Sequence, residues 1–189
     1  MPTAKQAPRV CDVEARKLLG PRRSSVFSAP IREILEFKYY EKANIRSKEL
    51  TGKGISKQSF AITPKIIEVD NLLRSNSKLC KIIYEAHPEL CFFGLANGKS
   101  MKYNKKSQNG FIERLEILLK NWKPTEKALA EALLWCSNHS VRDDTVDALA
   151  MAIVATHPKS EIVTIPRKIQ QDKYGLPMQM IYPLTKKSL

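Results

Sequence analysis

A helix-rich α/β fold with a reduced sheet is what the sequence predicts, because segments with helical spacing of apolar residues outnumber short strand-like runs. A chain of 189 residues can bury a core without help from a disulfide or a metal. We expect one domain over residues 11–189. Residues 1–10 hold two prolines and two basic residues and no apolar run, so a flexible tail is expected there.

Helices are expected through most of the first half of the chain. In three segments apolar residues recur every three or four positions between charged ones, which is the spacing of an amphipathic helix. These segments cover residues 12–19, 31–50 and 56–74. Asp12 is placed to cap the first of these helices. Pro64 is the awkward residue of the third, because proline lacks the N–H that a helix interior uses.

The best strand candidate covers residues 78–86. Its Leu-Cys-Lys-Ile-Ile-Tyr-Glu-Ala run joins β-branched and aromatic residues, and His87-Pro88 ends it. Such a run suits a strand buried on both faces of a sheet. Two further strands are expected over residues 161–165 and 178–182.

The second half of the chain alternates helices with one long polar loop. The expected helices cover residues 89–95, 110–122, 125–138 and 143–156. Residues 97–109 form a loop that carries four lysines around Tyr103. The last helix is nearly all apolar after its first turn, so it must be buried.

The charge balance points to a polyanionic partner. The chain has 32 Lys and Arg against 19 Asp and Glu, a formal net charge of +13. Such a surplus favours nucleic acid, although a basic surface that serves only solubility has the same composition. The side chains expected to contact phosphates are Arg22, Arg23, Lys53, Lys99, Lys102, Lys105 and Lys106. Tyr103 is expected either to stack on a base or to anchor its loop.

Membrane insertion and secretion are not expected. No apolar run approaches 18 residues, and the first ten residues lack the apolar core of a secretory signal. The four cysteines form no Cys-x-x-Cys pair, so a cytoplasmic protein with reduced thiols is expected.

Three carboxylates open the last predicted helix. Asp143 and Asp147 are four residues apart, and Asp144 and Asp147 three, so all three can point to one side. Capping explains Asp143, but a carboxylate at position 147 on a buried helix needs a cation. That cation is Mg²⁺ or Mn²⁺ in one interpretation. In the other, Asp147 pairs with an arginine such as Arg142 or lies at the surface.

At these carboxylates the sequence resembles a known motif. Asp-Thr-Val-Asp-Ala-Leu-Ala-Met-Ala-Ile, from Asp144, is similar to the last catalytic motif of RNase H-like nucleases of the RuvC resolvase kind. Nearly the whole chain resembles domain of unknown function family 429, predicted RNase H-like nucleases. The matching motifs, in order, cover residues 11–20, 21–27, 50–56, 64–70, 85–92 and 143–149.

The resemblance implies a metal-dependent nuclease that hydrolyses phosphodiesters. It implies Asp144, Asp147 and Glu85 as catalytic metal ligands, with Mg²⁺ or Mn²⁺ as the cofactor. The family's first strands and their two carboxylates have no counterpart before residue 11. The resemblance therefore implies the C-terminal portion of an RNase H-like fold, with catalysis uncertain in this short form.

Other readings of the same residues stay open. The chain could be a non-catalytic basic module that binds DNA or RNA. It could also be an interaction protein or homo-oligomer that completes its sheet through the unpaired edge of residues 78–86. His87 could act as a general base or be structural, and Glu89 could cap or salt-bridge its helix.

Overall fold

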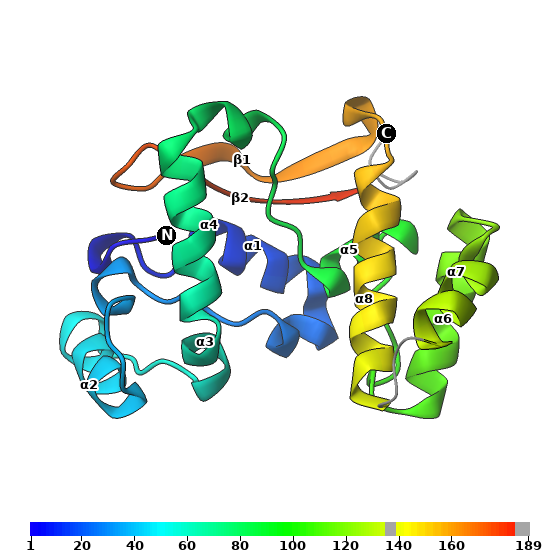
Figure 1. Cartoon of the computed structure of the whole chain (residues 1–189), viewed down its shortest axis with the longest axis horizontal. Helices are drawn as coiled ribbons and strands as arrows, with labels where there is room; N and C mark the ends of the chain where they lie inside the picture. Colours follow the sequence, from blue (N-terminus) through cyan, green and yellow to red (C-terminus); the bar gives the residue numbers. More distant parts are fainter. Residues whose placement is uncertain (135–138, 184–189) are drawn as a thin grey trace. The chain divides into compact units, whose positions relative to one another are not determined.

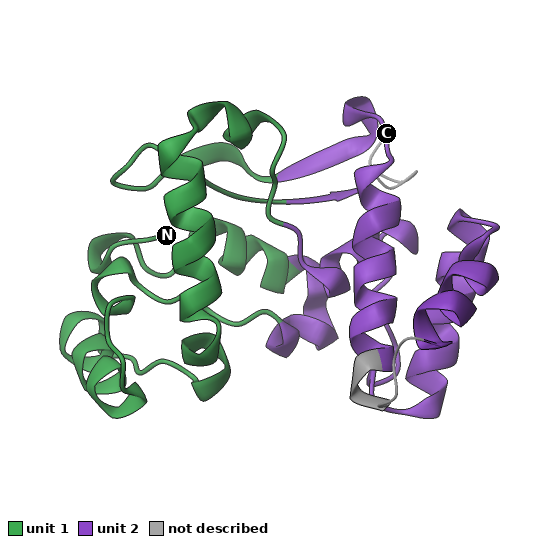
Figure 2. Ribbon diagram, viewed as in Figure 1, with its two compact units in different colours: residues 1–17, 26–85, 165–180 green, residues 18–25, 86–164, 181–189 purple. Residues whose placement is uncertain are grey.

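The computed structural model describes residues 1–134 and 139–183 (Figure 1). The chain divides into two compact units, which are described separately (Figure 2). Unit 1 contains Met1–Lys17, Val26–Glu85 and Ile165–Met180. Unit 2 contains Leu18–Ser25, Ala86–Thr164 and Ile181–Leu189.

The predicted class is confirmed in its broad form, since the chain is α/β, helix-rich and has one small antiparallel sheet. The helices that lie wholly or mainly in unit 1 are α1 (Val10–Leu19), α2 (Tyr40–Thr51), α3 (Lys57–Ala61) and α4 (Thr63–Ser75). Those of unit 2 are α5 (Pro88–Leu95), α6 (Gln108–Asn121), α7 (Thr125–Leu134) and α8 (His139–Ala155). The last four residues of the helix expected over 125–138 lie outside the described residues.

Unit 1 packs a small apolar cluster between its short helices. Ile31, Ile34, Ala43 and Ile55 are buried together. Tyr40 meets the ring of Phe60 edge-on, with the centroids 5.8 Å apart. The single helix expected over residues 31–50 is wrong, because a 3-10 turn over Arg32–Ile34 precedes α2. The chain bends between them, and both segments then face the same cluster.

Local sequence signals explain three further boundaries of unit 1. Gly52 ends α2 with a φ of 70°, a left-handed conformation that glycine adopts at little cost. The helix expected over residues 56–74 is two helices, and Pro64 stands in the first turn of α4, where its missing N–H costs nothing. The capping role of Asp12 is wrong, because α1 begins two residues earlier. The Asp12 carboxylate instead accepts a hydrogen bond from the Arg9 guanidinium.

The strand expected over residues 78–86 is wrong. A 3-10 helix occupies Ser77–Lys81, and only Ala86 bridges to a strand residue, Ile181. Ile82 is 71% exposed and Tyr84 is 39% exposed, so the run is not buried on both faces. A β-branched run becomes a strand only where a neighbouring strand can pair with it, and residues 78–85 have no such neighbour in the described chain.

The sheet consists of β1 (Ile162–Gln171) and β2 (Pro177–Pro183). The strand expected over residues 178–182 is confirmed, whereas the strand expected over 161–165 begins there but extends to Gln171. Asp172 fixes the turn between them. One of its carboxylate oxygens accepts from the backbone N–H groups of Tyr174 and Leu176, at 2.8 and 3.0 Å. Gly175 completes the turn with a φ of 76°.

The first residues of the chain are held within unit 1 by several contacts. Pro2 and Arg9 are buried, and the amino group of Met1 donates to Asp172 at 2.8 Å. A 3-10 turn covers Ala4–Gln6. These contacts join residues 1–9 to the β-turn and to the helices of unit 1.

Unit 2 has an apolar core of its own. Its buried residues come from α5, α6, α7 and α8 and from Met101 of the loop, with Phe92 and Leu118 fully buried. In the described part of the chain, no helix is long and apolar enough to cross a membrane. The core positions α6 and α8 against each other, and the polar groups at one end of this pair form the candidate site.

Candidate functional site

The aspartates of α8 lie beyond its first turn. The helix begins at His139, four residues earlier than expected, so the capping role of Asp143 is wrong. Asp144 is exposed, whereas Asp143 and Asp147 are partly buried. The latter two line a shallow pocket of unit 2 together with Lys105, Phe111, Arg114 and Val146.

Lys105 supplies the cation that the buried face of α8 requires. Its Nζ lies 2.8 Å from Oδ2 of Asp147, which is only 15% exposed. Burial lowers the pKa of Lys105. The hydrogen bond and charge of Asp147, with the charges of Asp143 and Asp144, outweigh burial, so the pKa lies above its usual value. All three aspartates therefore favour a cation at this point.

Arg142, the partner considered for Asp147, is engaged elsewhere. Its guanidinium lies over the ring of Phe111, with Cζ 4.3 Å from the ring centroid. This arrangement is a cation–π contact. The residue that neutralises Asp147 therefore comes from a loop 42 residues away in the sequence.

The basic loop that carries Lys105 is firmly attached to α6. The Glu113 carboxylate accepts from the backbone N–H groups of Lys102 and Tyr103, at 2.8 and 3.1 Å. Ser107 caps α6 by accepting from the N–H of Gly110 at 3.0 Å. A Cβ at position 110 would collide with the Asn104 carbonyl, so only glycine permits this approach of loop and helix.

The predicted phosphate contacts divide into exposed and structural side chains. Arg23, Lys53, Lys99, Lys102 and Lys106 are exposed. Arg22 is structural, since it donates through Nε to the Met101 carbonyl at 2.9 Å and lies 3.8 Å from Glu89. Lys105 is committed to Asp147, as described above.

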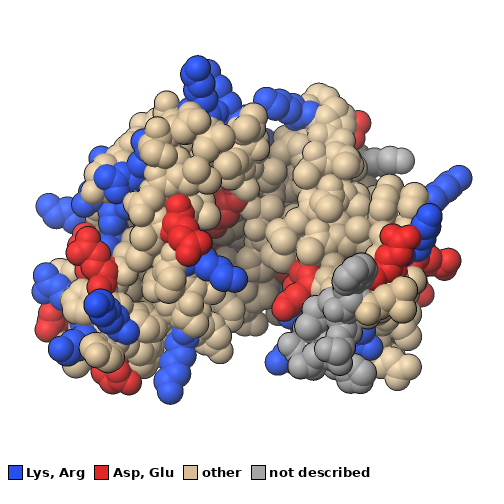
Figure 3. Space-filling model, in the orientation of Figure 1, with Lys and Arg blue, Asp and Glu red and all other residues tan. Residues whose placement is uncertain are grey.

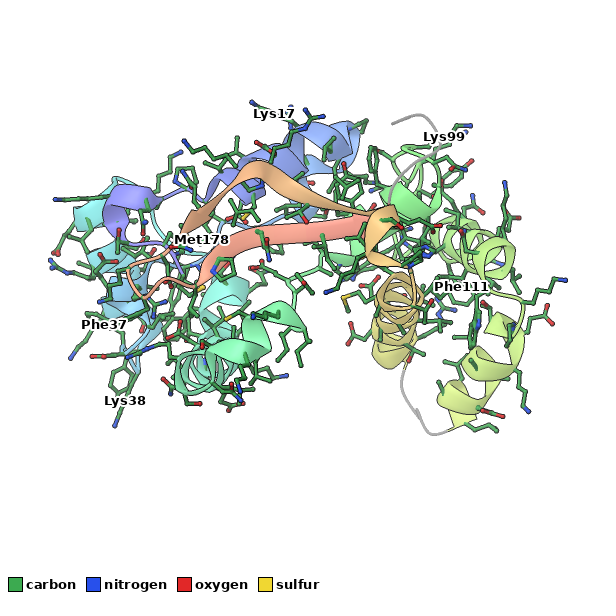
Figure 4. All side chains as sticks on the ribbon, turned by 90° about the horizontal axis from the view of Figure 1, so that it is seen from above. Lys17, Phe37, Lys38, Lys99, Phe111 and Met178 are labelled. Atoms are coloured by element: carbon green, nitrogen blue, oxygen red, sulfur yellow. The ribbon has the colours of Figure 1, made fainter. Side chains whose placement is uncertain are left out.

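One face of the molecule shows how its charged side chains are distributed. On the face drawn in Figure 3, the described Lys and Arg side chains alternate with Asp and Glu and do not form one patch. The net charge therefore does not locate an interface by itself. Figure 4 shows Lys99 of the loop extending away from the ribbon, whereas Phe111 lies among the helices of unit 2.

Glu85, the third expected metal ligand, is held by an arginine in unit 1. Both oxygens accept from Arg9, each at 2.6 Å, and Arg9 also donates to buried Asp12 at 2.7 Å. Burial lowers the pKa of Arg9, but the two carboxylates outweigh it and raise that pKa well above its usual value. Glu85 is thus part of an ion-pair network.

Glu89 is likewise committed to an arginine, in the core of unit 2. Its oxygens accept from Nη2 of Arg114 at 2.8 and 3.1 Å, and both residues are buried. Of the two roles expected for Glu89, a salt bridge is the one observed, but its partner belongs to α6 and not to Glu89's own helix. Arg114 also donates to the Gly110 carbonyl of its own helix at 3.0 Å, and a longer bond to the Tyr103 carbonyl, at 3.4 Å, connects the pair to the basic loop.

His87 has the geometry of a structural residue. Its Nδ1 accepts from the N–H of Glu89 at 3.2 Å, which caps α5, and its Nε2 lies 3.1 Å from the Ser25 carbonyl. With both ring nitrogens engaged, the ring has no nitrogen left to act as a general base.

Sequence reasoning missed Arg114 and Glu113. A signal for Arg114 was present, because it stands four residues from Gly110 and from Leu118 on the buried face of α6. A charge in such a position requires a partner. Glu113 has no comparable signal, since its role depends on where the loop folds back.

The buried cysteines are unreactive by position. Burial raises the pKa of Cys11 and of Cys91 to about 12 each, so both are thiols at neutral pH. They pack as small apolar residues in units 1 and 2, respectively, and the charge of Asp147 adds to the effect of burial on the pKa of Cys91.

Comparison with protein families gives a match over residues 1–171 to the family described as "Protein of unknown function (DUF429)". The chain belongs to this family. No curated protein and no solved structure matches the sequence. The resemblance to this family is therefore confirmed, and the activity of this DUF429 chain has to be argued from its site.

The residues of the candidate site do not fit a two-metal centre. Among the described residues, no three His, Cys, Asp or Glu side chains gather as a metal site. Mg²⁺ is commonly bound by one or two carboxylates, with water and substrate phosphates completing its shell. Asp144 and Asp147 could supply two carboxylates if Lys105 moved aside.

Proposed function

We propose that this chain binds nucleic acid at unit 2 and hydrolyses phosphodiesters there, with Mg²⁺ or Mn²⁺ held by Asp144 and Asp147. The observation that carries the proposal is the Lys105 ammonium at 2.8 Å from Asp147, because it marks a point where three aspartates attract a cation. A bound divalent cation would activate water and neutralise charge on the phosphate.

The basic loop supplies the second requirement of such a site. Exposed Lys99, Lys102 and Lys106 belong to the loop whose Lys105 reaches α8. Their ammonium groups would hold the phosphate backbone as positioning contacts and would not read sequence. Substrate phosphates would also complete the shell of a cation that the protein alone holds weakly.

A second candidate function is a non-catalytic nucleic-acid-binding module. The observation that favours it is the pairing of two other acidic residues with arginines: Glu85, the third expected metal ligand, with Arg9, and Glu89 with Arg114. Neither is available as a further ligand in this arrangement. In that case the loop lysines would bind phosphates while Lys105 stays on Asp147.

Calorimetric titration with Mn²⁺ tests the first proposal. We expect binding to the wild-type chain, and a loss of more than about tenfold in affinity in Asp144→Asn and in Asp147→Asn, because even an indirect partner of a ligand contributes that much. The exposed Glu116→Gln of α6 is the matched control and should bind as the wild type does. Cleavage of labelled oligonucleotides is then measured in Mn²⁺.

The two candidate functions give different results in this experiment. Mn²⁺ binding with cleavage that both aspartate variants lose supports the nuclease. Oligonucleotide binding without Mn²⁺ binding or cleavage supports the non-catalytic module. A folded wild-type chain that binds neither Mn²⁺ nor oligonucleotides contradicts both.

A further inference from the structure

We infer that the nucleic acid taken by unit 2 is single-stranded, and that Tyr103 stacks on one of its bases. The inference rests on the proposed function, since it names the substrate class of the same site. It is carried by the position, exposure and fixed backbone of Tyr103 in the basic loop.

Tyr103 presents an aromatic ring at the surface from a backbone that is already ordered. Its side chain is 37% exposed, although tyrosine rings are usually well covered in a core. Its N–H and that of Lys102 are both bound by the Glu113 carboxylate. Its carbonyl accepts a longer bond from Arg114, at 3.4 Å. A ring on a fixed backbone loses little conformational entropy on binding.

Other residues already perform the anchoring that Tyr103 was alternatively expected to provide. Glu113 holds two N–H groups of the loop, and Ser107 donates to the Asn104 carbonyl at 2.7 Å. Lys105 ties the same loop to α8. The attachment of the loop therefore does not require an exposed phenol ring.

The charges around Tyr103 match a single-strand site. Nζ of Lys102 lies 5.1 Å from the ring centroid, and Lys99 and Lys106 are exposed in the same loop. Proteins that bind single strands combine aromatic rings, on which bases stack, with cations that follow the backbone. In a duplex the bases already stack on one another, so a ring fixed in a loop gains no base face without unpairing the duplex.

The same loop connects the stacking position to the aspartates. Lys105 is two residues beyond Tyr103 and is bonded to Asp147. A strand with one base on Tyr103 and its phosphates on the neighbouring lysines therefore lies beside α8. This arrangement would present the backbone, and not a base, to Asp144 and Asp147.

Fluorescence anisotropy with labelled oligonucleotides of about 12 nucleotides tests the inference, since single-strand sites span roughly 4–16 nucleotides. The probes are oligo-dT, oligo-U and a DNA duplex of the same length. We expect Tyr103→Ala to weaken single-strand binding about tenfold, within the range measured for loss of a stacked base. Tyr103→Phe keeps the ring and should bind as the wild type does.

Tyr39→Ala is the matched control. Tyr39 is 63% exposed and has Nζ of Lys42 at 5.8 Å from its ring centroid, but it belongs to unit 1 and lies at the start of α2. It should leave binding unchanged. Far-ultraviolet circular dichroism and thermal unfolding confirm that each variant is folded before its affinity is compared.

The outcomes separate the inference from the proposed function. Equal binding by Tyr103→Ala and wild type, or equal affinity for duplex and single strand, overturns the inference. The triple variant Lys99→Ala, Lys102→Ala, Lys106→Ala then tests the proposed function separately. If this variant loses oligonucleotide binding, the loop binds nucleic acid even though Tyr103 does not stack on a base. Failure of the folded wild-type chain to bind any of the probes overturns both.

Discussion

Each unit holds a cation between aspartates, but the surroundings of the two cations differ. In unit 1, Arg32 donates to Asp70 at 2.8 and 2.6 Å and also to Asp172, and these side chains are 8%, 8% and 0% exposed. In unit 2, Lys105 bonds to Asp147, and the lysine side chain is 41% exposed.

The arginine of unit 1 also lies against an aromatic ring. Arg32 lies over the ring of Tyr174 at 4.6 Å, and Arg74 lies 3.8 Å from the same centroid. The planar guanidinium can satisfy two carboxylates at once, whereas the ammonium of Lys105 is a point charge on a flexible stem. The first arrangement fixes a fold, and the second can yield its place to another cation.

Removing the arginine should have the largest effect. Arg32→Met removes the cation that buried Asp70 and Asp172 share, and leaves Asp172 with the Met1 amino group at 2.8 Å and Asp70 with Arg74 at 3.6 Å. We therefore expect a loss of about 3 kcal/mol in the free energy of unfolding, the lower end for a broken buried pair. Urea denaturation measures it. The control is Arg46→Met, which removes an exposed pair with Glu49 and should cost about 1 kcal/mol or less. Equal losses in the two variants would mean that the pairs of Arg32 with Asp70 and Asp172 stabilise the fold no more than an exposed ion pair does.

Acid should weaken unit 1 by a smaller amount. The Arg32 hydrogen bond lowers the pKa of Asp70. Burial acts to raise the pKa of Asp172, but hydrogen bonds from the Met1 amino group and from two backbone N–H groups outweigh it, and that pKa is also lowered. Both aspartates thus stabilise the fold above their usual pKa of about 3.9.

This stability should be lost as the pH falls below about 4 and passes through the lowered pKa values that the two aspartates have in the folded state. Thermal unfolding followed from pH 6 to about pH 2 should show the loss in the wild type and a shallower one in Arg32→Met. An identical pH dependence in the two proteins would contradict a contribution of Arg32 to the lowered pKa values of these aspartates.

Replacing the lysine of unit 2 should change stability least. Lys105→Met removes a partly exposed pair, so the free energy of unfolding should change by about 1 kcal/mol or less. Because the ammonium competes for Asp147, Mn²⁺ affinity should rise by up to about fivefold, which corresponds to the same energy. Calorimetry and urea denaturation measure the two quantities. A large loss of stability without tighter Mn²⁺ binding would mean that Lys105, like Arg32, serves to stabilise the fold.

The candidate site was only partly predictable. Asp143, Asp144 and Asp147 stand out because carboxylates interrupt an apolar helix, and the lysine-rich loop stands out by composition. That Lys105 reaches Asp147 has no local signal, since 42 residues separate them. Glu85 looked equivalent to the aspartates in sequence, but Arg9, 76 residues away, binds both of its oxygens.

By itself the sequence determined the helix-rich α/β class, α5, α6, β2, the start of β1 and the family. These features follow from apolar periodicity, turn residues and short motifs, which act over a few neighbouring positions. Only the tertiary structure decided that residues 78–85 form no strand, that α8 begins at His139, and which cation each carboxylate binds. Strand pairing and ion pairing are chosen among residues far apart in the chain, so they depend on which side chains packing brings within reach.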